Sequence, residues 1–421
     1  MTIKLGCIAD DFTGATDLAN NLVRAGMRAV QTIGIPTSTQ AIEADAIVVA
    51  LKSRTAPVAE AIAESLQALH WLKAQGAQQI YFKYCSTFDS TAQGNIGPVL
   101  EALMAHTGCD FTIATPAFPD NGRTVFKGYL FVGDALLNES GMQHHPLTPM
   151  HDANLVRVLQ EQVTGKVGLV DYKAVTQHAA AIKTRFNELK KTGVAMAIID
   201  ATSNDDLMRL GLALKGMPLV SGGSGVAIGL PQNFGITPSE TSSSLPGATG
   251  YQAIVSGSCS AATQRQVADF IAKGLPVFQL DPDVIATGSN SNSSKIVADV
   301  MAWAKPQLSQ GPVLVYSTDN PERVKQAQSK YGVAQAGEMM ENALAQVACG
   351  LVKLGVKQLI TAGGETSGAC VKALEISQLR IGPQIDTGVP WCYSEPLHIA
   401  LKSGNFGGDD FFTRAFTSLK A

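Results

Sequence analysis

Short apolar runs alternate along the chain with longer segments in which apolar residues recur every three or four positions. Runs such as KLGCIA, AIVVAL and QIYFKYC have the length and composition of buried strands. Segments such as ATDLANNLVRAG and VAEAIAESLQALHWLKAQG have the helical period, and each ends at a glycine, which commonly terminates helices. The pattern continues through FTIATP, KVGLV, AMAIID, QAIVSG, VLVYS and QLITAGG. Alternating strands and helices predict an α/β fold with mostly parallel sheets.

One segment interrupts the alternation and marks a domain boundary. Residues 237–250, TPSETSSSLPGATG, are rich in Ser, Thr, Pro and Gly and follow neither the strand nor the helix period. A chain of 421 residues exceeds what one core usually holds. We therefore expect two layered α/β domains, residues 1–236 and 251–421, joined by this linker and separated by a cleft.

Composition and charge exclude several classes of protein. The chain is 45% apolar and 16% charged, its net charge is -3, and no basic stripe interrupts it, so nucleic acid is not an expected partner. Its 7 cysteines form no CxxC pair, which argues against a disulfide framework and a zinc site. No apolar run approaches the roughly 20 residues that span a bilayer, and MTIKLGCIADD lacks the apolar core of a secretory signal. We expect a cytoplasmic protein that binds no membrane.

Four loops join an apolar strand to a following helix through small residues. They are VSGGSGVAIG, VSGSCSAATQ, ITAGGETSGA and LKSGNFGGDD, and the last three belong to the second domain. Backbone N–H groups in such loops can approach phosphate oxygens at a helix start, although one such loop alone is often only a tight turn. Three in one domain favour a nucleotide site. The chain has no GxxxxGK[ST] motif, Ile228 replaces the last glycine of GxGxxG, and Ser258 lacks the second glycine of a nucleophile elbow.

Polar residues follow several predicted strands of the first domain. Because the carboxyl ends of parallel strands share one edge, these residues should form a rim on which Arg and Lys meet a carboxylate and Asp meets hydroxyl groups. Each could instead cap a helix or be a surface charge. Together they predict a site for a small polyhydroxy acid, whereas the HH-x5-H pattern near residue 150 is no standard metal-ligand spacing. We expect Asp17, one turn further on, to be a surface charge of its helix. The rim residues are Asp10, Asp11, Arg54, Lys83, Ser86, Asp89, Arg123 and His145.

Long motifs resemble a known family. IADDFTGATDLA, LKSRT, KYCSTFDSTAQGNIGPV, NGRTVFKGYLFVGD, SGGSG, SGSCS, ITAGGETS and LKSGNFG resemble the four-carbon acid sugar kinases and, within that family, the 3-oxo-tetronate 4-kinases. The resemblance spans nearly the whole chain. It implies an N-terminal acid-sugar domain and a C-terminal ATP domain. It also places the ATP contacts on Ser256, Gly257, Ser258, Gly363, Gly364, Glu365, Thr366, Gly404 and Gly407.

The reaction implied is ATP-dependent phosphorylation of the C4 hydroxyl of a 3-oxo-tetronate, in the catabolism of four-carbon acid sugars. ATP would carry Mg²⁺ across its phosphates, with no protein ligand of the metal assigned. Arg54 and Lys83 would meet the substrate carboxylate. Asp11 is our first candidate to accept the C4 proton, and Asp10, the second, would mainly hold substrate.

Two other readings stay open. One is a kinase of a C3-reduced acid such as D-threonate or erythronate, because only the oxidation state at C3 differs. The other is a non-catalytic sugar-acid binding protein, which would ignore nucleotide. The partners expected are therefore a small acid sugar and ATP, and the chain could form a homodimer.

Overall fold

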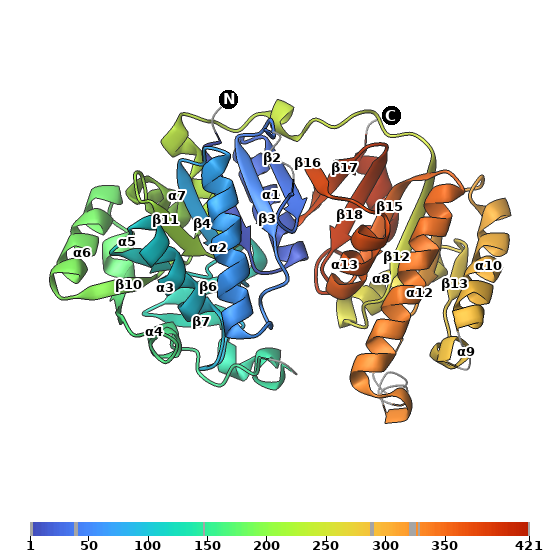
Figure 1. The fold of residues 1–421 in the computed structure, drawn as a ribbon, viewed down its shortest axis with the longest axis horizontal. Coiled ribbons are helices and arrows are strands. Elements are labelled where there is room, and N and C mark those ends of the chain that lie inside the picture. Colours follow the sequence, from blue (N-terminus) through green and yellow to red (C-terminus); the bar gives the residue numbers. More distant parts are fainter. Residues whose placement is uncertain are drawn as a thin grey trace. The chain divides into compact units, whose positions relative to one another are not determined.

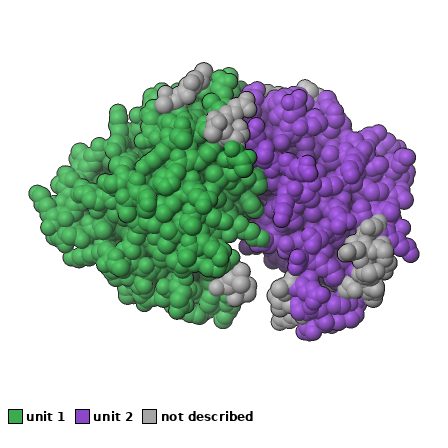
Figure 2. Space-filling model, in the orientation of Figure 1, with its two compact units in different colours: residues 1–243 green, residues 244–421 purple. Residues whose placement is uncertain are grey.

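The chain forms two compact units, Met1–Ser243 and Ser244–Ala421, drawn as a ribbon in Figure 1 and coloured separately in Figure 2. The computed structural model describes residues 3–37, 41–145, 148–286, 290–319, 326 and 329–419. The point of division falls inside the Ser-, Pro- and Gly-rich segment 237–250. The predicted α/β fold with mostly parallel sheets is confirmed.

The first unit is built on parallel strands in the order β11-β4-β1-β3-β2. Helix α1 packs against β1, β2 and β3, and α2 packs against β1 and α3. The strands are nearly continuous apolar runs because the sheet is covered by other elements. Their bounds are β1 Leu5–Ala9, β2 Ala29–Ile33, β3 Ala46–Ala50, β4 Gln79–Lys83 and β11 Leu219–Gly222. The helices are α1 Phe12–Arg24, α2 Val58–Ala74, α3 Ile96–Thr107, α4 Leu155–Gln160, α5 Tyr172–Val175, α6 Ala179–Lys191 and α7 Asn204–Ala213.

Two small sheets complete the first unit. Strands β5 Thr112–Ala114, β10 Val194–Ile199 and β9 Lys166–Val170 are parallel, whereas β6 Arg123–Phe126, β7 Tyr129–Val132 and β8 Ala135–Leu136 are antiparallel. We did not predict the antiparallel hairpin. Its turn is Lys127-Gly128, and both residues have positive φ (52° and 77°), as a two-residue hairpin turn requires.

The second unit has parallel strands in the order β13-β14-β12-β15-β18, followed by antiparallel β17 and β16. The antiparallel pair was also not predicted. Trp391 on β17 is fully buried and packs with Phe411, Phe412 and Phe416 in the core. The strands are β12 Tyr251–Ser256, β13 Val277–Gln279, β14 Val313–Tyr316, β15 Val356–Ala362, β16 Gln378–Asp386, β17 Val389–Ser394 and β18 Leu397–Lys402. The helices are α8 Ala261–Ala272, α9 Pro282–Ala286, α10 Asn290–Gln307, α12 Val333–Lys353, α13 Gly364–Ala373 and α14 Phe411–Arg414.

Each parallel sheet changes its direction of winding at its first strand. In the first unit, β2 and β3 lie on one side of β1, while β4 and β11 lie on the other. In the second unit, β13 and β14 lie on one side of β12, while β15 and β18 lie on the other. Ligands of open α/β sheets bind in the crevice at such a point, outside the carboxyl ends of the strands. The fold therefore directs attention to the loops after β1 and β4, and after β12 and β15.

The segment between the units is anchored at both ends. Ser242 Oγ donates to the Val23 carbonyl in the first unit (2.9 Å), and His398 Nε2 donates to the Pro246 carbonyl in the second (2.9 Å). Within the described residues, no helix has both the length and the apolar character needed to cross a bilayer.

Candidate functional site

Two adjacent carboxylates lie at the switch point of the first sheet. The Asp10 N–H donates to the Lys83 carbonyl on β4 (3.1 Å), and its own carbonyl accepts from the Arg54 N–H (3.2 Å). The Asp10 carboxylate receives both Nε and Nη2 of Arg54 at 2.8 Å, and Nη2 also donates to Asp11 at 2.6 Å. Arg54 is thus a bidentate partner of Asp10 and is shared with Asp11.

Asp11 also begins helix α1. Its side chain accepts from the Gly14 N–H (3.1 Å) and from Thr13 Oγ1 (3.0 Å), as an N-cap residue does. Burial would raise the pKa of Asp11, but Arg54, Lys83 and these hydrogen bonds outweigh it and lower the pKa. For Asp10, burial dominates and raises the pKa despite Arg54. Two adjacent carboxyl groups thus differ in acidity because their surroundings differ.

The loop that carries Arg54 is held by an asparagine. Asn95 Nδ2 donates to the carbonyls of Ser53 (2.7 Å) and Ala56 (2.8 Å). Asn95 precedes α3 and is buried, so these two hydrogen bonds hold the loop after β3 in place from the protein interior. Its place after the long KYCSTFDSTAQ stretch gave a sequence signal, but its role as a support came only from the structure.

Lys83 ends β4 and is only 3% exposed. Its Nζ lies 4.0 Å from Asp11 Oδ1, which is an ion pair without a close hydrogen bond. A Cβ on Gly14 would overlap both Lys83 Nζ and Asp11 Oδ1. Glycine at this position is therefore what lets the ammonium group approach the start of α1.

Asp17 is not a surface charge, and our prediction for it was wrong. It is 6% exposed, because α1 is buried along most of its length. Its Oδ2 accepts from Ser224 Oγ (2.5 Å), while Oδ1 is buried without a hydrogen bond. Burial raises the pKa of Asp17 to about 6, although Lys83 opposes this shift. Asp17 is thus a buried carboxyl group that belongs to the same electrostatic cluster as Lys83.

Arg123 supplies a third cation near Arg54 and Lys83. Its Nη1 donates to the Asn121 carbonyl, while its Nε is buried without a hydrogen bond, as is Nδ2 of Asn121. Arg123 interacts electrostatically with Asp17 and Asp89. Buried donors without acceptors are costly, so they commonly mark a place that a ligand or water completes.

The remaining predicted rim residues are less closely joined. Asp89 accepts from Thr87 Oγ1 (2.6 Å), and Ser86 lies in the same loop, shortly after the end of β4 at Lys83. His145 Nδ1 accepts from the Thr148 N–H (3.1 Å). Among the described residues there is no hydrogen bond or ion pair between His145 and Arg54, Lys83 or Arg123. The structure therefore brings together Asp10, Asp11, Arg54 and Lys83, with Asp17 added. Arg123 is linked to this group by its electrostatic interaction with Asp17, and it interacts in the same way with Asp89.

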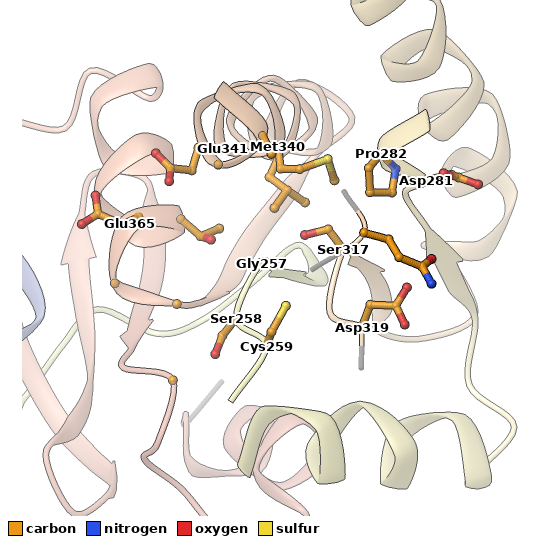
Figure 3. Close-up of a pocket in the computed structure, with 18 of the residues that line it drawn as sticks. Gly257, Ser258, Cys259, Asp281, Pro282, Ser317, Asp319, Met340, Glu341 and Glu365 are labelled. Carbon is orange, nitrogen blue, oxygen red and sulfur yellow. The ribbon is translucent and has the colours of Figure 1, made fainter. Parts of the chain in front are cut away.

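The second unit contains a cavity of about 560 Å³ at its own switch point. Figure 3 shows Ser258 and Cys259, from the loop after β12, on one side and Met340 and Glu341, from α12, on the other. Most residues predicted to contact ATP line it, although the contact itself stays a prediction. They are Gly257, Ser258, Gly363, Gly364, Glu365, Thr366 and Gly404.

Ser256 and Gly407 lie outside the cavity lining. Ser256 is fully buried, and its hydroxyl group bonds with that of Thr318 (2.9 Å). The Gly407 carbonyl accepts from Gln266 Nε2 (3.0 Å). Both residues support loops of the cavity and do not themselves line it.

Several lining residues were missed in the sequence. Asp281 follows β13 and Asp319 follows β14, so the strand-end rule used for the first domain could have found them. Met340, Glu341 and Leu344 reach the cavity because α12 packs across β12, β14 and β15, which sequence spacing does not reveal.

The start of α13 faces this cavity. Gly363 precedes the helix at φ 119° and offers no side-chain cap to the first N–H groups. Such a helix start is suited to an anion. Among the described residues, no three His, Cys, Asp or Glu side chains cluster closely enough to hold a metal ion.

Comparison with known proteins assigns both units. A model of a sugar-binding N-terminal domain matches residues 5–230, and one of a nucleotide-binding C-terminal domain matches residues 253–412. The 3-oxo-tetronate kinase of Pseudomonas fluorescens is 55% identical, over 99% of this chain and 97% of that protein. The 3-oxo-tetronate kinase of Cupriavidus necator is 56% identical over the same shares.

Solved structures agree on the fold. A Salmonella typhimurium LT2 protein, described provisionally as a tRNA synthase, is 42% identical with a TM-score of 0.91, over 99% of this chain and 100% of that one. A Haemophilus influenzae protein is 45% identical with a TM-score of 0.81, over 98% and 99% of the two chains. The chain therefore belongs to the four-carbon acid sugar kinase family, in which a sugar-binding domain precedes a nucleotide-binding domain.

Proposed function

We propose that this protein is an ATP-dependent kinase that phosphorylates the C4 hydroxyl of a 3-oxo-tetronate. The observation that carries the proposal is that the two switch points differ in chemistry. One has buried Lys and Asp side chains and half-buried Arg side chains, with polar atoms that lack hydrogen-bond partners, and the other has a cavity bordered by glycine turns and a helix start. The names of the curated relatives support the same reaction.

In this proposal, residues 1–236 bind the acid, residues 251–421 bind ATP, and residues 237–250 connect them. Transfer requires the two bound substrates to meet, so we retain the cleft between the domains as a prediction. Ser258, Gly363, Gly364 and Gly404 border the nucleotide phosphates. Ser256 and Gly407, which lie behind the lining, act by supporting these loops.

The carboxylate of the acid is assigned to Lys83 and Arg123. The Arg123 Nε and Asn121 Nδ2 groups lack acceptors, and a carboxylate would supply them. The Arg54 guanidinium is already engaged by Asp10 and Asp11. We therefore propose that Arg54 orients these two carboxylates, in place of the direct substrate contact that the sequence suggested.

The reaction forms a bond from the C4 oxygen to the γ-phosphorus and breaks the bond from that phosphorus to the β–γ bridging oxygen. The C4 proton passes to a carboxylate. Asp11 remains our candidate acceptor, but its lowered pKa makes it a weak base. Phosphoryl transfer depends mainly on positioning and charge neutralisation, so a weak base is compatible with it.

Magnesium fits the donor set of the nucleotide cavity. Asp281, Asp319, Glu341 and Glu365 offer the oxygen ligands that Mg²⁺ prefers, and this ion commonly uses one or two carboxylates together with substrate phosphates. Glu365, beside Gly364, is the residue we assign to it. When bound, the ion would neutralise charge on the phosphates.

Other functions are less well supported. A net charge of -3 and a sequence without a basic stripe argue against RNA binding by this chain, which the tRNA synthase description of one relative would suggest. A non-catalytic acid-binding protein would not need the nucleotide cavity. We also predict a cytoplasmic location and a homodimer, which cell fractionation and light scattering would test.

The decisive experiment is a coupled ADP-release assay with four-carbon acids that are oxidised or reduced at C3. We expect the highest kcat/KM with a 3-oxo-tetronate. A higher kcat/KM with D-threonate or erythronate would change the proposed substrate but leave the proposed kinase activity in place. Nucleotide binding without turnover on any acid would overturn the proposed reaction.

A further inference from the structure

A buried lysine lies beneath a loop of the nucleotide cavity. Lys402, the last residue of β18, is 0% exposed. Its Nζ donates to the carbonyls of Ser403 (3.0 Å), Gly404 (3.1 Å) and Phe406 (3.2 Å), and to Thr263 Oγ1 (3.1 Å). One ammonium group thus gathers three carbonyls of a single loop.

This ammonium group has no anionic partner among the described residues. On two neighbouring elements the charged side chains pair at the surface: Arg265 of α8 with Asp409 (2.8 Å), and Arg414 of α14 with Asp386 (2.6 Å) and Asp410 (3.3 Å). Helix α13, which also packs against β18, carries Glu365 in the cavity lining and Lys372 on its exposed side. Burial alone lowers the pKa of Lys402 to about 7. A buried charge without a counter-charge is unfavourable, so an anion brought close to it would be stabilised.

The arrangement of the loop determines where its donors point. In a planar trans peptide, the carbonyl and the following N–H point in opposite directions. Carbonyls 403, 404 and 406 turn toward Lys402, so the N–H groups of residues 404, 405 and 407 turn away from it. Gly404 lines the cavity. Successive N–H groups in a turn, here those of residues 404 and 405, form a site that can bind an anion.

The same lysine is linked to a second loop of the cavity. Thr263 Oγ1, which accepts from Lys402, lies 2.9 Å from the Gly404 carbonyl and 3.1 Å from Ser258 Oγ. Ser260 Oγ donates to the Gly404 carbonyl at 2.6 Å. The lysine therefore holds the loop after β18 against the loop after β12.

We propose that Lys402 is a positioning residue that shapes residues 403–407 for a nucleotide phosphate, and that this phosphate supplies its missing counter-charge. The inference rests on the proposed nucleotide site. It implies that nucleotide binding and protonation of Lys402 favour each other. Binding at pH 8 should then take up a proton, and affinity should fall as the pH rises above about 7.

Calorimetric titration of the full chain with Mg-ADP tests this, at pH 7 to 9 and in Tris and HEPES, whose ionisation enthalpies differ. For the wild type we expect proton uptake at pH 8. Lys402→Met keeps the length of the side chain but loses its charge, so uptake should disappear and Kd should rise about tenfold at pH 7. Subtracting the proton uptake of Lys402→Met from that of the wild type cancels the protons exchanged by the nucleotide itself. Lys372→Met, on the exposed side of α13, is the matched control and should behave as wild type.

The outcomes separate this inference from the proposed function. Wild-type protein that binds no nucleotide would overturn the kinase proposal. Nucleotide binding without excess proton uptake relative to Lys402→Met would overturn only the role of Lys402. If Lys402→Met does not fold, Lys402→Arg stays charged at every pH tested. The comparison then uses Lys402→Arg, whose affinity for Mg-ADP should lack the fall above about pH 7 expected for the wild type. The same pH dependence of affinity in both proteins would reject the proposal.

Discussion

At the scale of single residues, Asp17 was wrongly predicted to be a surface charge, and the pH dependence of stability tests its burial directly. Its pKa of about 6 means that the folded protein keeps this proton to higher pH than the unfolded chain, which releases it near pH 4. The wild-type unfolding free energy should therefore fall as the pH rises from about 4 to about 6. Asp17→Asn removes this titration, so relative to wild type it should gain roughly 2 kcal/mol across that window. Urea unfolding at pH 4.5 and pH 7 measures it, and parallel pH curves would contradict the assignment.

Replacing Arg123 and replacing Arg54 should change different kinetic parameters. Arg123→Ala removes a charged donor from the acid site, so KM for the acid should rise about tenfold or more while KM for ATP changes little. Arg54→Ala should lower kcat as well, because Asp10 and Asp11 lose their shared partner. Arg185→Ala on α6, whose side chain is 41% exposed and pairs with Glu188, is the control. A rise in KM for ATP of the same size would remove Arg123 from the acid site.

Asp11→Asn tests the proton acceptor. The amide keeps the shape of the side chain but cannot accept a proton, so general-base assistance, typically 10²–10⁴-fold, would be lost from kcat. Asp10→Asn should instead weaken acid binding more than turnover. A loss below about tenfold in Asp11→Asn would show that the carboxylate only positions substrate, as a loose transition state permits.

At the scale of elements, the start of α1 is the most demanding feature of the acid site. Gly14→Ala places a methyl group where Lys83 Nζ and Asp11 Oδ1 lie, so the lysine must move from the site. We expect acid binding to weaken at least tenfold, as for loss of a charged contact, with nucleotide binding unchanged. Gly141→Ala, whose Cβ would meet nothing within 4 Å, controls for the loss of glycine. Equal acid affinity in the two variants would show that Lys83 is not a ligand of the acid.

The sequence predicted the parallel strands well because they are short apolar runs that alternate with helical segments. It missed β6–β7 and β16–β17, whose alternation is weak and whose turns provide the better signal. Asp17 was misjudged from helical spacing alone. In FTGATDLANNLVR it is the sole acidic residue, and a helix so poor in charge is one that tertiary packing buries. The Lys402 contacts lay beyond prediction, since they depend on how a loop folds back on one side chain.

At the scale of the whole molecule, the proposal assigns one substrate to each unit, and hydrogen exchange can test this division. Mg-ADP should slow exchange in residues 256–264, 363–367 and 403–407, around the cavity of the second unit. The acid should slow exchange in residues 9–17, 83–89 and 121–123 of the first unit. Bound ligand stabilises the segments it contacts by mass action, so protection should follow ligand concentration. If the acid alone protected residues 256–264, 363–367 and 403–407, the acid would bind the second unit, contrary to the proposal.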